Sequence, residues 1–303
     1  MVEVMSIIYT DSSLIEKHTN KVLGLTWSYI ERIPLYHFYP GYTVLKAWIT
    51  GCPLKCDVCL DSALKVPIDS IDLKSIDKKT ISDILRRIKT SFIFFHGGEC
   101  LLHWRWLKNL IIELKDEGIL TGVKTSCLVE NSIIADAAKL LDTILIELTP
   151  NLPEKLCELV RFNLKTVERL EPHLEVLLLI NKVVHQKSLS TILDLLNDLN
   201  KNIPILIYPL IEQQYAHLSN LRKILINTGF NYVYIIDDPF YKFEHTYCPK
   251  CKNIVIERHQ RTLRRCLLRG SVCPICGYTI NIKGTCKTLQ RKISLLLTEE
   301  PIL

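Results

Sequence analysis

The amino-acid sequence predicts an α/β protein in which a partial (β/α) barrel precedes a small cysteine-rich module. Between residues 43 and 236, short apolar segments of strand length alternate with longer amphipathic segments, which is the pattern of parallel βα units. After residue 240 this alternation stops, and two closely spaced cysteine pairs appear. We therefore expect four parts, namely an N-terminal lead-in (1–42), the partial barrel (43–240), a zinc ribbon (241–290) and a tail (291–303).

The apolar segments define the expected strands, which are Thr43–Thr50, Phe92–His96, Val123–Ser126, Thr143–Leu148, Glu175–Ile180, Ile203–Tyr208 and Tyr232–Ile236. The amphipathic segments define the expected helices, which are Ser82–Lys89, Trp104–Glu117, Ser132–Leu141, Glu154–Leu170, Leu189–Asn200 and Ala216–Asn227. Ser132 and Ser190 are candidate N-caps, and Gly118 and Gly229 fit positions just after helix ends. In such barrels, functional residues gather where the carboxyl ends of the strands meet.

A run of cysteines follows the first expected strand at this edge. Cys52, Cys56 and Cys59 have the spacing CxxxCxxC. Three thiolates can hold three irons of a [4Fe–4S] cluster and leave the fourth iron open to a small molecule. A partial zinc site or half of a disulfide framework is the alternative, but zinc sites usually combine two CxxC pairs. The next cysteine, Cys100, has no partner nearby in the sequence, so we expect the cluster.

The second expected strand ends in Gly97-Gly98-Glu99. Two glycines let the backbone approach a ligand closely, and a carboxylate can accept hydrogen bonds from an ammonium group. Such a turn is by itself an ordinary link between a strand and a helix. Its position one βα unit after the cysteine run makes it a second candidate site at the same edge.

The C-terminal module contains two CPxC pairs, formed by Cys248 with Cys251 and by Cys273 with Cys276. Four thiolates in this arrangement suit a closed tetrahedral Zn²⁺ site that contributes to folding. A second iron–sulfur cluster on the same thiolates is the competing interpretation. We expect Cys266 and Cys286 to be buried small apolar residues and not metal ligands.

Charge is distributed unevenly along the chain. The net formal charge is +6, but residues 242–292 hold twelve Lys and Arg against Glu244 and Glu257. The run from Arg258 to Arg265 could contact nucleic-acid phosphates or an acidic protein. A solvated face is the simpler interpretation, because no aromatic pattern interleaves the run.

Localisation is predicted from absent signals and from cysteine content. We find neither an apolar run long enough to span a bilayer nor an evident signal peptide. Twelve cysteines without an export signal favour metal ligation in a reducing cytoplasm over disulfides. The sequence therefore predicts a cytoplasmic protein with no membrane partner.

Two blocks of sequence carry a resemblance to a known family. The first is Ile30–Gly41 leading into the cysteine run, and the second comprises Gly229–Tyr234, His245–Pro249, Ile256–Arg258 and Cys273–Gly277. The chain resembles the radical S-adenosylmethionine (radical SAM) proteins of the AmmeMemoRadiSam system, relatives of the pyruvate formate-lyase activating enzymes. It departs from that pattern at Val58, at Leu60-Asp61, at Thr125-Ser126-Cys127 and at Glu147-Leu148-Thr149.

The resemblance implies a radical SAM barrel with one [4Fe–4S] cluster and with SAM as cofactor or co-substrate. In that family, an external electron donor reduces the cluster, SAM is cleaved reductively, and a 5′-deoxyadenosyl radical abstracts hydrogen from a substrate. Here Gly97, Gly98 and Glu99 would seat the methionine part of SAM, and Ser126 and Glu147 would contact its ribose or carboxylate. The substrate, a protein or a small molecule, is not specified. The alternatives are an RNA-modifying radical SAM enzyme and a non-catalytic iron–sulfur and zinc interaction protein.

Overall fold

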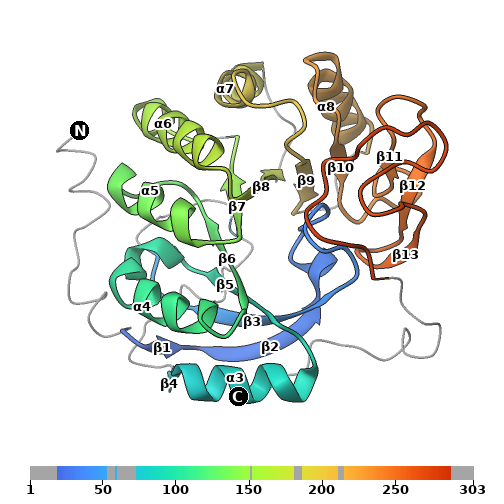
Figure 1. Ribbon diagram of the computed structural model, residues 1–303. Coiled ribbons are helices and arrows are strands. Elements are labelled where there is room, and N and C mark those ends of the chain that lie inside the picture. The colour runs from blue at the N-terminus through green and yellow to red at the C-terminus, as the bar shows by residue number, and fades with distance from the viewer. Residues whose placement is uncertain are drawn as a thin grey trace.

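A computed structural model describes residues 19–52, 59, 73–150, 152–180, 186–210 and 215–287. Its centre is an open eight-stranded sheet with the order β10-β9-β8-β7-β6-β5-β3-β2 (Figure 1). All neighbours are parallel except β2, which pairs antiparallel with β3. The strands are β2 Gly24–Tyr29, β3 Thr43–Ile49, β5 Phe92–Gly97, β6 Leu120–Thr125, β7 Thr143–Leu148, β8 His173–Ile180, β9 Ile205–Pro209 and β10 Val233–Ile235.

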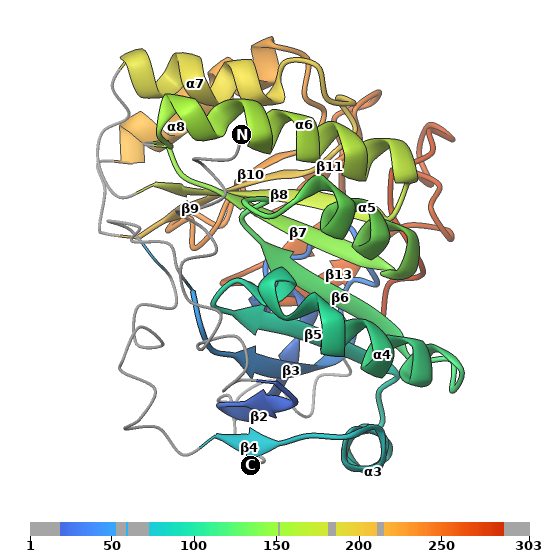
Figure 2. The ribbon, with the colours of Figure 1, turned by 90° about the vertical axis from the view of Figure 1, so that its left-hand side faces the viewer.

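The helices lie along an arc on the outer face of this sheet, as Figures 1 and 2 show. They are α3 Lys78–Ile88, α4 Trp104–Lys115, α5 Asn131–Leu140, α6 Glu154–Leu170, α7 Gln186–Leu196 and α8 Tyr215–Asn227. Short 3-10 turns, η1 Ile30–Arg32 and η4 Cys100–His103, and a small sheet of β1 Lys21–Val22 with β4 Lys74–Ser75 complete this part. The expected α/β fold with a mostly parallel sheet is confirmed.

Two details of the predicted barrel differ from the structure. Strand β2 lies in the segment expected to be a lead-in, and it extends the barrel sheet at one edge. Ser132 and Ser190 are not N-caps, because α5 begins at Asn131 and α7 begins at Gln186. Gly118 and Gly229 do follow helix ends, and their positive φ angles of 72° and 103° are conformations that favour glycine.

Alternate residues of each strand face two different cores. Leu45, Ala47 and Ile49 of β3 pack in the outer core between the sheet and the helices. Val44 of β3 and Tyr234 of β10 pack instead in an inner core with residues of the C-terminal module and of segment 30–38. The inner core therefore covers the amino ends of β3 and β5, and at β8, β9 and β10 it reaches the carboxyl ends as well, through Leu179, Tyr208 and Ile236.

The C-terminal module contains a three-stranded antiparallel sheet, β11 Thr246–Tyr247, β12 Ile254–Arg258 and β13 Leu263–Cys266. It lies beside α8 and β10 in Figure 1. Its last segment runs along residues 37–40, where Tyr39 N donates to Lys283 O (2.8 Å) and Lys283 N donates to His37 O (2.8 Å). This pairing joins the module to the segment before β3.

The prediction for Cys266 and Cys286 is wrong, because the two residues form a disulfide across 20 residues of sequence. Both are half-buried. The pairing depends on the chain folding back from β13 toward residues 37–40, which no spacing in the sequence indicates. Among the described residues, no helix is both long enough and apolar enough to cross a bilayer.

Candidate functional site

The glycine turn and the start of the cysteine run lie side by side at the carboxyl edge of the sheet. Gly98 N donates to Ile49 O (2.9 Å), and Glu99 N donates to Gly51 O (3.1 Å). A Cβ atom on Gly98 would lie 2.3 Å from Gly51 O, so only glycine permits this approach. The residue that precedes Cys52 is thus held directly against the predicted methionine seat.

The cysteines of the run are placed only in part. Cys52 and Cys59 are half-buried, while Cys56 lies outside the described residues. His103, at the end of η4, fixes the same strand end by donating from Nε2 to Thr50 O (3.0 Å). The half-buried thiol of Cys52, which follows this fixed strand end, suits a cluster ligand that is partly accessible.

Glu99 is buried, and hydrogen bonds from its own chain surround its carboxylate. Thr125 Oγ1 (2.8 Å), Ser126 N (2.8 Å) and Ser126 Oγ (2.6 Å) donate to it, and Leu101 N donates at 3.3 Å. Burial raises the pKa of Glu99, and the hydrogen bonds from Ser126 oppose that rise. The carboxylate therefore ties the end of β5 to the end of β6.

Ser126 and Glu147, the other two predicted SAM contacts, lie in different surroundings. Ser126 lies directly beside Glu99, as described above. Glu147 on β7 instead forms an ion pair with Lys124 Nζ on β6 (2.8 Å), with side chains 17% and 10% exposed. Of the pair, only Ser126 belongs to the Glu99 cluster in the described residues.

A group of side chains on the inner face includes His96, which directly precedes the glycine turn and could face the site, and three residues that the sequence reasoning missed, Lys46, Trp48 and Lys124. Lys46, Trp48, His96 and Lys124 alternate with residues of the outer core, so they face inward above the inner core. Lys46 Nζ lies 5.3 Å from the Trp48 ring centroid, and that ring lies 4.0 Å from the His96 ring. The sequence does indicate this group, because one lysine lies within each of two otherwise mostly apolar strands, Lys46 in β3 and Lys124 in β6.

His96 is held neutral in this group. Burial, with smaller contributions from Lys124 and Lys46, lowers the pKa of His96 well below its usual value. Its Nε2 atom is buried and has no hydrogen-bond partner among the residues that the structure describes. Since an unsatisfied buried nitrogen costs roughly 1–3 kcal/mol, His96 is a candidate contact for a polar ligand atom.

The four cysteines of the C-terminal module converge as predicted. The Sγ atoms of Cys248, Cys251, Cys273 and Cys276 all lie within 4.8 Å of one another. Cys248 and Cys276 are 3.5 Å apart, and Cys251 and Cys273 are 3.7 Å apart. A tetrahedron with Zn–S bonds of about 2.3 Å has edges of roughly 3.8 Å. The residues therefore fit a tetrahedral metal ion in a zinc-ribbon-like module.

The basic run is not a single solvated face. Arg258 is fully buried, and Arg261 pairs with Asp237 (3.1 Å). Arg264 and Arg265 are exposed on β13. The interpretation of the run as one solvated surface is therefore wrong, because its first arginine belongs to the core.

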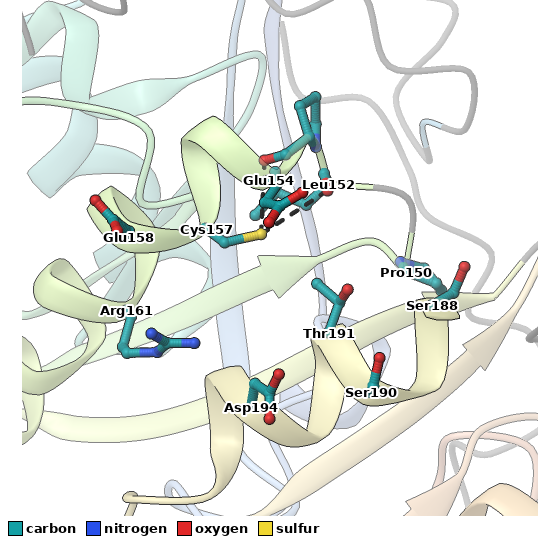
Figure 3. A pocket seen from close by; sticks show the side chains of 11 residues that line it. Pro150, Leu152, Glu154, Cys157, Glu158, Arg161, Ser188, Ser190, Thr191 and Asp194 are labelled. Carbon is teal, nitrogen blue, oxygen red and sulfur yellow. Dashed lines mark hydrogen bonds between the residues drawn. The ribbon is translucent and has the colours of Figure 1, made fainter. Parts of the chain in front are cut away.

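An outer groove of about 540 Å³ lies between the first turns of α6 and α7 (Figure 3). Its side chains include Cys157, whose thiol donates to the carbonyls of Leu152 (3.8 Å) and Pro153 (3.5 Å). Burial raises the pKa of Cys157, so it is a protonated thiol and a poor nucleophile. The described side chains of this groove therefore do not indicate a particular reaction.

Comparison with known proteins adds a domain match and several distant relatives. The model of a 4Fe–4S single cluster domain matches residues 40–152. An uncharacterized protein from Methanocaldococcus jannaschii is 24% identical over 283 residues, which cover 86% of this chain and 84% of that protein. The domain match includes all three cysteines of the run and the glycine turn.

Solved structures are similar only loosely. A domain of a pyruvate-formate lyase-activating enzyme from Bacteroides vulgatus has a TM-score of 0.41 at 19% identity, covering 47% of this chain and 96% of that domain. QueE from Escherichia coli has a TM-score of 0.44 at 14% identity, covering 74% and 96%. The match to a 4Fe–4S single cluster domain agrees with the iron–sulfur cluster expected on the cysteine run.

Proposed function

We propose that this protein is a radical SAM enzyme in which Cys52, Cys56 and Cys59 ligate a [4Fe–4S] cluster. One observation carries the proposal most strongly. Gly51, next to the first cysteine, accepts a hydrogen bond from Glu99 N at 3.1 Å. A ligand bound at the open iron would thus lie beside the glycine turn that the resemblance assigns to the methionine part of SAM.

The cluster and SAM would together supply a 5′-deoxyadenosyl radical, which abstracts hydrogen from the substrate. The chain positions and shields the reactants. Gly98 lets the glycine turn pack directly against Gly51 beside the first cysteine, while Glu99 and Ser126 fix the ends of β5 and β6 relative to each other. The inward-facing group around Trp48 and His96 would form the substrate wall.

The C-terminal module would hold Zn²⁺ in a structural role. Hydrogen bonds from Asn253 lower the pKa of Cys251 to about 6, so this thiol loses its proton readily for metal binding. No residue outside the four cysteines is needed to complete a tetrahedral site. Metal bound here stabilises the module that covers the amino ends of the barrel strands.

A second candidate function is a non-catalytic iron–sulfur and zinc interaction protein. The observation in its favour is that four donors, from Leu101, Thr125 and Ser126, already occupy the two oxygens of the Glu99 carboxylate. In this case the glycine turn would serve folding, and the cluster would bind no SAM. The two candidates differ in whether SAM contacts the cluster.

Electron paramagnetic resonance of the reduced cluster, recorded with and without SAM after anaerobic reconstitution, distinguishes the two. We expect SAM to change the spectrum of the natural protein. Gly98→Ala should reduce that change, because its Cβ atom would collide with Gly51 O. Ser132→Ala, at an exposed position on α5, is the control. An identical spectrum with and without SAM in the natural protein would favour the non-catalytic candidate.

A further inference from the structure

A second groove lies between α8 and the C-terminal module, apart from the edge that carries Cys52. The groove measures about 610 Å³. One wall is the end of α8 with the following turn, and the other is the loop that leads into the first CPxC pair. Its lining residues are Arg222, Ile226, Gly229, Phe230, Asn231, Lys242, Phe243, Tyr247, Cys248, Pro249 and Lys252.

The charges that line this groove have one sign. Arg222, Lys242 and Lys252 are cationic, and no carboxylate is among the lining residues just named. A metal held by four thiolates would add about two negative charges below the floor, where Cys248 is buried. Lys250, in the same CPxC turn, is exposed and adds to the positive side. The rim therefore remains cationic when the metal site is filled.

Aromatic rings hold these cations in place. The Arg222 guanidinium lies 4.3 Å from the Phe243 ring centroid, and Lys242 Nζ lies 5.7 Å from the same ring. Lys201 Nζ lies 4.3 Å from the centroid of Phe230. Cation–π contacts order long side chains that would otherwise move freely. Phe243 thus orders Arg222 and Lys242 in the groove, which lowers the entropy cost of binding an anion at these two side chains.

Arg222 keeps donors available for such a ligand. Its Nε atom donates to Val233 O at 2.8 Å, which orients the guanidinium. A guanidinium has five N–H donors in a planar fork that suits phosphate oxygens. Together with Lys242 and Lys252, Arg222 gives the groove three cations from two separate segments of the chain, which can pair with the phosphates of a polyanion.

We propose that this groove binds the phosphodiester backbone of a single-stranded nucleic acid. Its size accommodates one strand, and backbone-tracking cationic grooves are the usual means of binding single strands without sequence preference. The site is separate from the edge that carries Cys52. It would therefore hold a polynucleotide on the protein, independently of any reaction with SAM.

Fluorescence anisotropy with a labelled oligoribonucleotide of about 15 nucleotides, a length within reach of such grooves, tests the proposal. The natural protein should bind with an affinity that falls as salt rises. Each neutralised phosphate contributes about −0.7 to the slope of log K against log salt for single strands. Removing two charges in Lys242→Gln/Lys252→Gln should therefore make the slope shallower by about 1.4 and weaken binding at every salt concentration.

The matched control is Lys139→Gln/Lys155→Gln, which removes the same charge from exposed positions on α5 and α6. It should leave the slope and affinity unchanged. An equal loss in both double variants would overturn the proposal, because net charge alone would then explain binding. Equal competition by poly-glutamate would also overturn it, in favour of an acidic protein partner.

An oligodeoxyribonucleotide of the same sequence distinguishes the two sources of phosphodiester. Equal binding would mean that the backbone alone is recognised, and preference for the ribose form would mean that the groove also reads the 2′-hydroxyl. All of these measurements use the zinc-loaded protein without SAM or reductant. Failure of this proposal therefore leaves the proposed SAM chemistry untouched, and the reverse also holds.

Discussion

The inner face of the barrel sheet has two ends with opposite characters. At the amino ends of the strands, residues 30–41 and the C-terminal module close the face with an apolar core and a buried hydrogen-bond network. At the carboxyl ends, the face carries Lys46, His96, Lys124 and Glu147 beside the glycine turn. The first end is packed and apolar, and the second carries charged and aromatic side chains beside the glycine turn.

At the closed end, the buried carboxylate of Glu175 accepts hydrogen bonds from backbone N–H groups. Glu175 accepts from Tyr36 N (2.9 Å) and His37 N (2.8 Å), and also from His173 Nε2 (2.9 Å). His37 in turn donates from Nδ1 to Asn281 O and accepts from the Tyr234 hydroxyl, each at 2.6 Å. The block Ile30–Gly41 is one of the two blocks that carry the family resemblance. Its residues therefore help to cover the inner face of the sheet and do not line the edge that carries Cys52.

Among the variants considered, loss of the metal from the C-terminal module should lower the thermal stability of the closed end most. In Cys273→Ser, we expect the module to lose its metal and the melting temperature to fall sharply, because structural zinc contributes about 10–16 kcal/mol in small modules. Metal content and thermal unfolding measure this. Cys157→Ser, which removes a half-buried thiol from α6, should change neither. Full metal content in Cys273→Ser would contradict the four-cysteine site.

Arg258→Ala tests the network that fastens the module to the barrel. The guanidinium donates to Tyr36 O, Thr246 Oγ1 and Glu244 O, and these acceptors would lose their partner inside the core. We expect a loss of about 3–5 kcal/mol in the free energy of unfolding, measured with urea. Arg264→Ala on exposed β13 should cost less than about 0.5 kcal/mol. Similar values for the two variants would show that burial of Arg258 is unimportant.

The pH dependence of the free energy of unfolding should show that the buried carboxyl of Glu31 has a raised pKa. Burial raises the pKa of Glu31 from 4.5 to about 7, against the attraction of Arg258, whose Nε lies 3.8 Å away. The folded state therefore holds a proton that the unfolded state releases, so Glu31 makes stability fall as pH rises from about 4.5 to 7. At about 1.4 kcal/mol for each pKa unit, this contribution amounts to roughly 3 kcal/mol at most.

Glu31→Gln should remove that decline, because glutamine does not titrate. Burial lowers the pKa of His37 to about 4, so His37 makes stability rise over nearly the same pH window. This opposing contribution is shared by both proteins, and the difference between them isolates Glu31. Urea unfolding at pH 5 and at pH 7.5 gives the two slopes. Parallel slopes would mean that Glu31 is ionised throughout.

Of the variants expected to lose stability, Ser126→Ala should lose the least. It tests the carboxyl ends of the strands, where Ser126 contacts Glu99. The variant removes the hydroxyl that donates to Glu99 at 2.6 Å and keeps the backbone donor. We expect about 1–2 kcal/mol of destabilisation, together with weaker binding of SAM measured by calorimetry. Ser132→Ala, on α5 away from Glu99, is the control. Unchanged SAM binding in Ser126→Ala would separate Glu99 from the cofactor site.

The sequence allowed the βα order to be predicted because Val, Ile and Leu fill the strands of the parallel sheet. Strand β2 was missed because Gly24, Thr26 and Ser28 interrupt its apolar pattern at an edge of the sheet. The two metal sites were predicted because ligand spacing is local in the chain. Contacts between distant segments were not accessible in this way, as Arg258 shows, since its acceptor Tyr36 O lies 222 residues away in the sequence.

The most direct test of the cluster edge is the amount of 5′-deoxyadenosine formed after anaerobic reconstitution, reduction with dithionite and addition of SAM. We expect the natural protein to form deoxyadenosine and Cys56→Ala to form none. Arg264→Ala, which changes an exposed charge on β13, should retain full formation. Absence of deoxyadenosine from the natural protein, at full cluster occupancy, would contradict the proposed radical SAM activity.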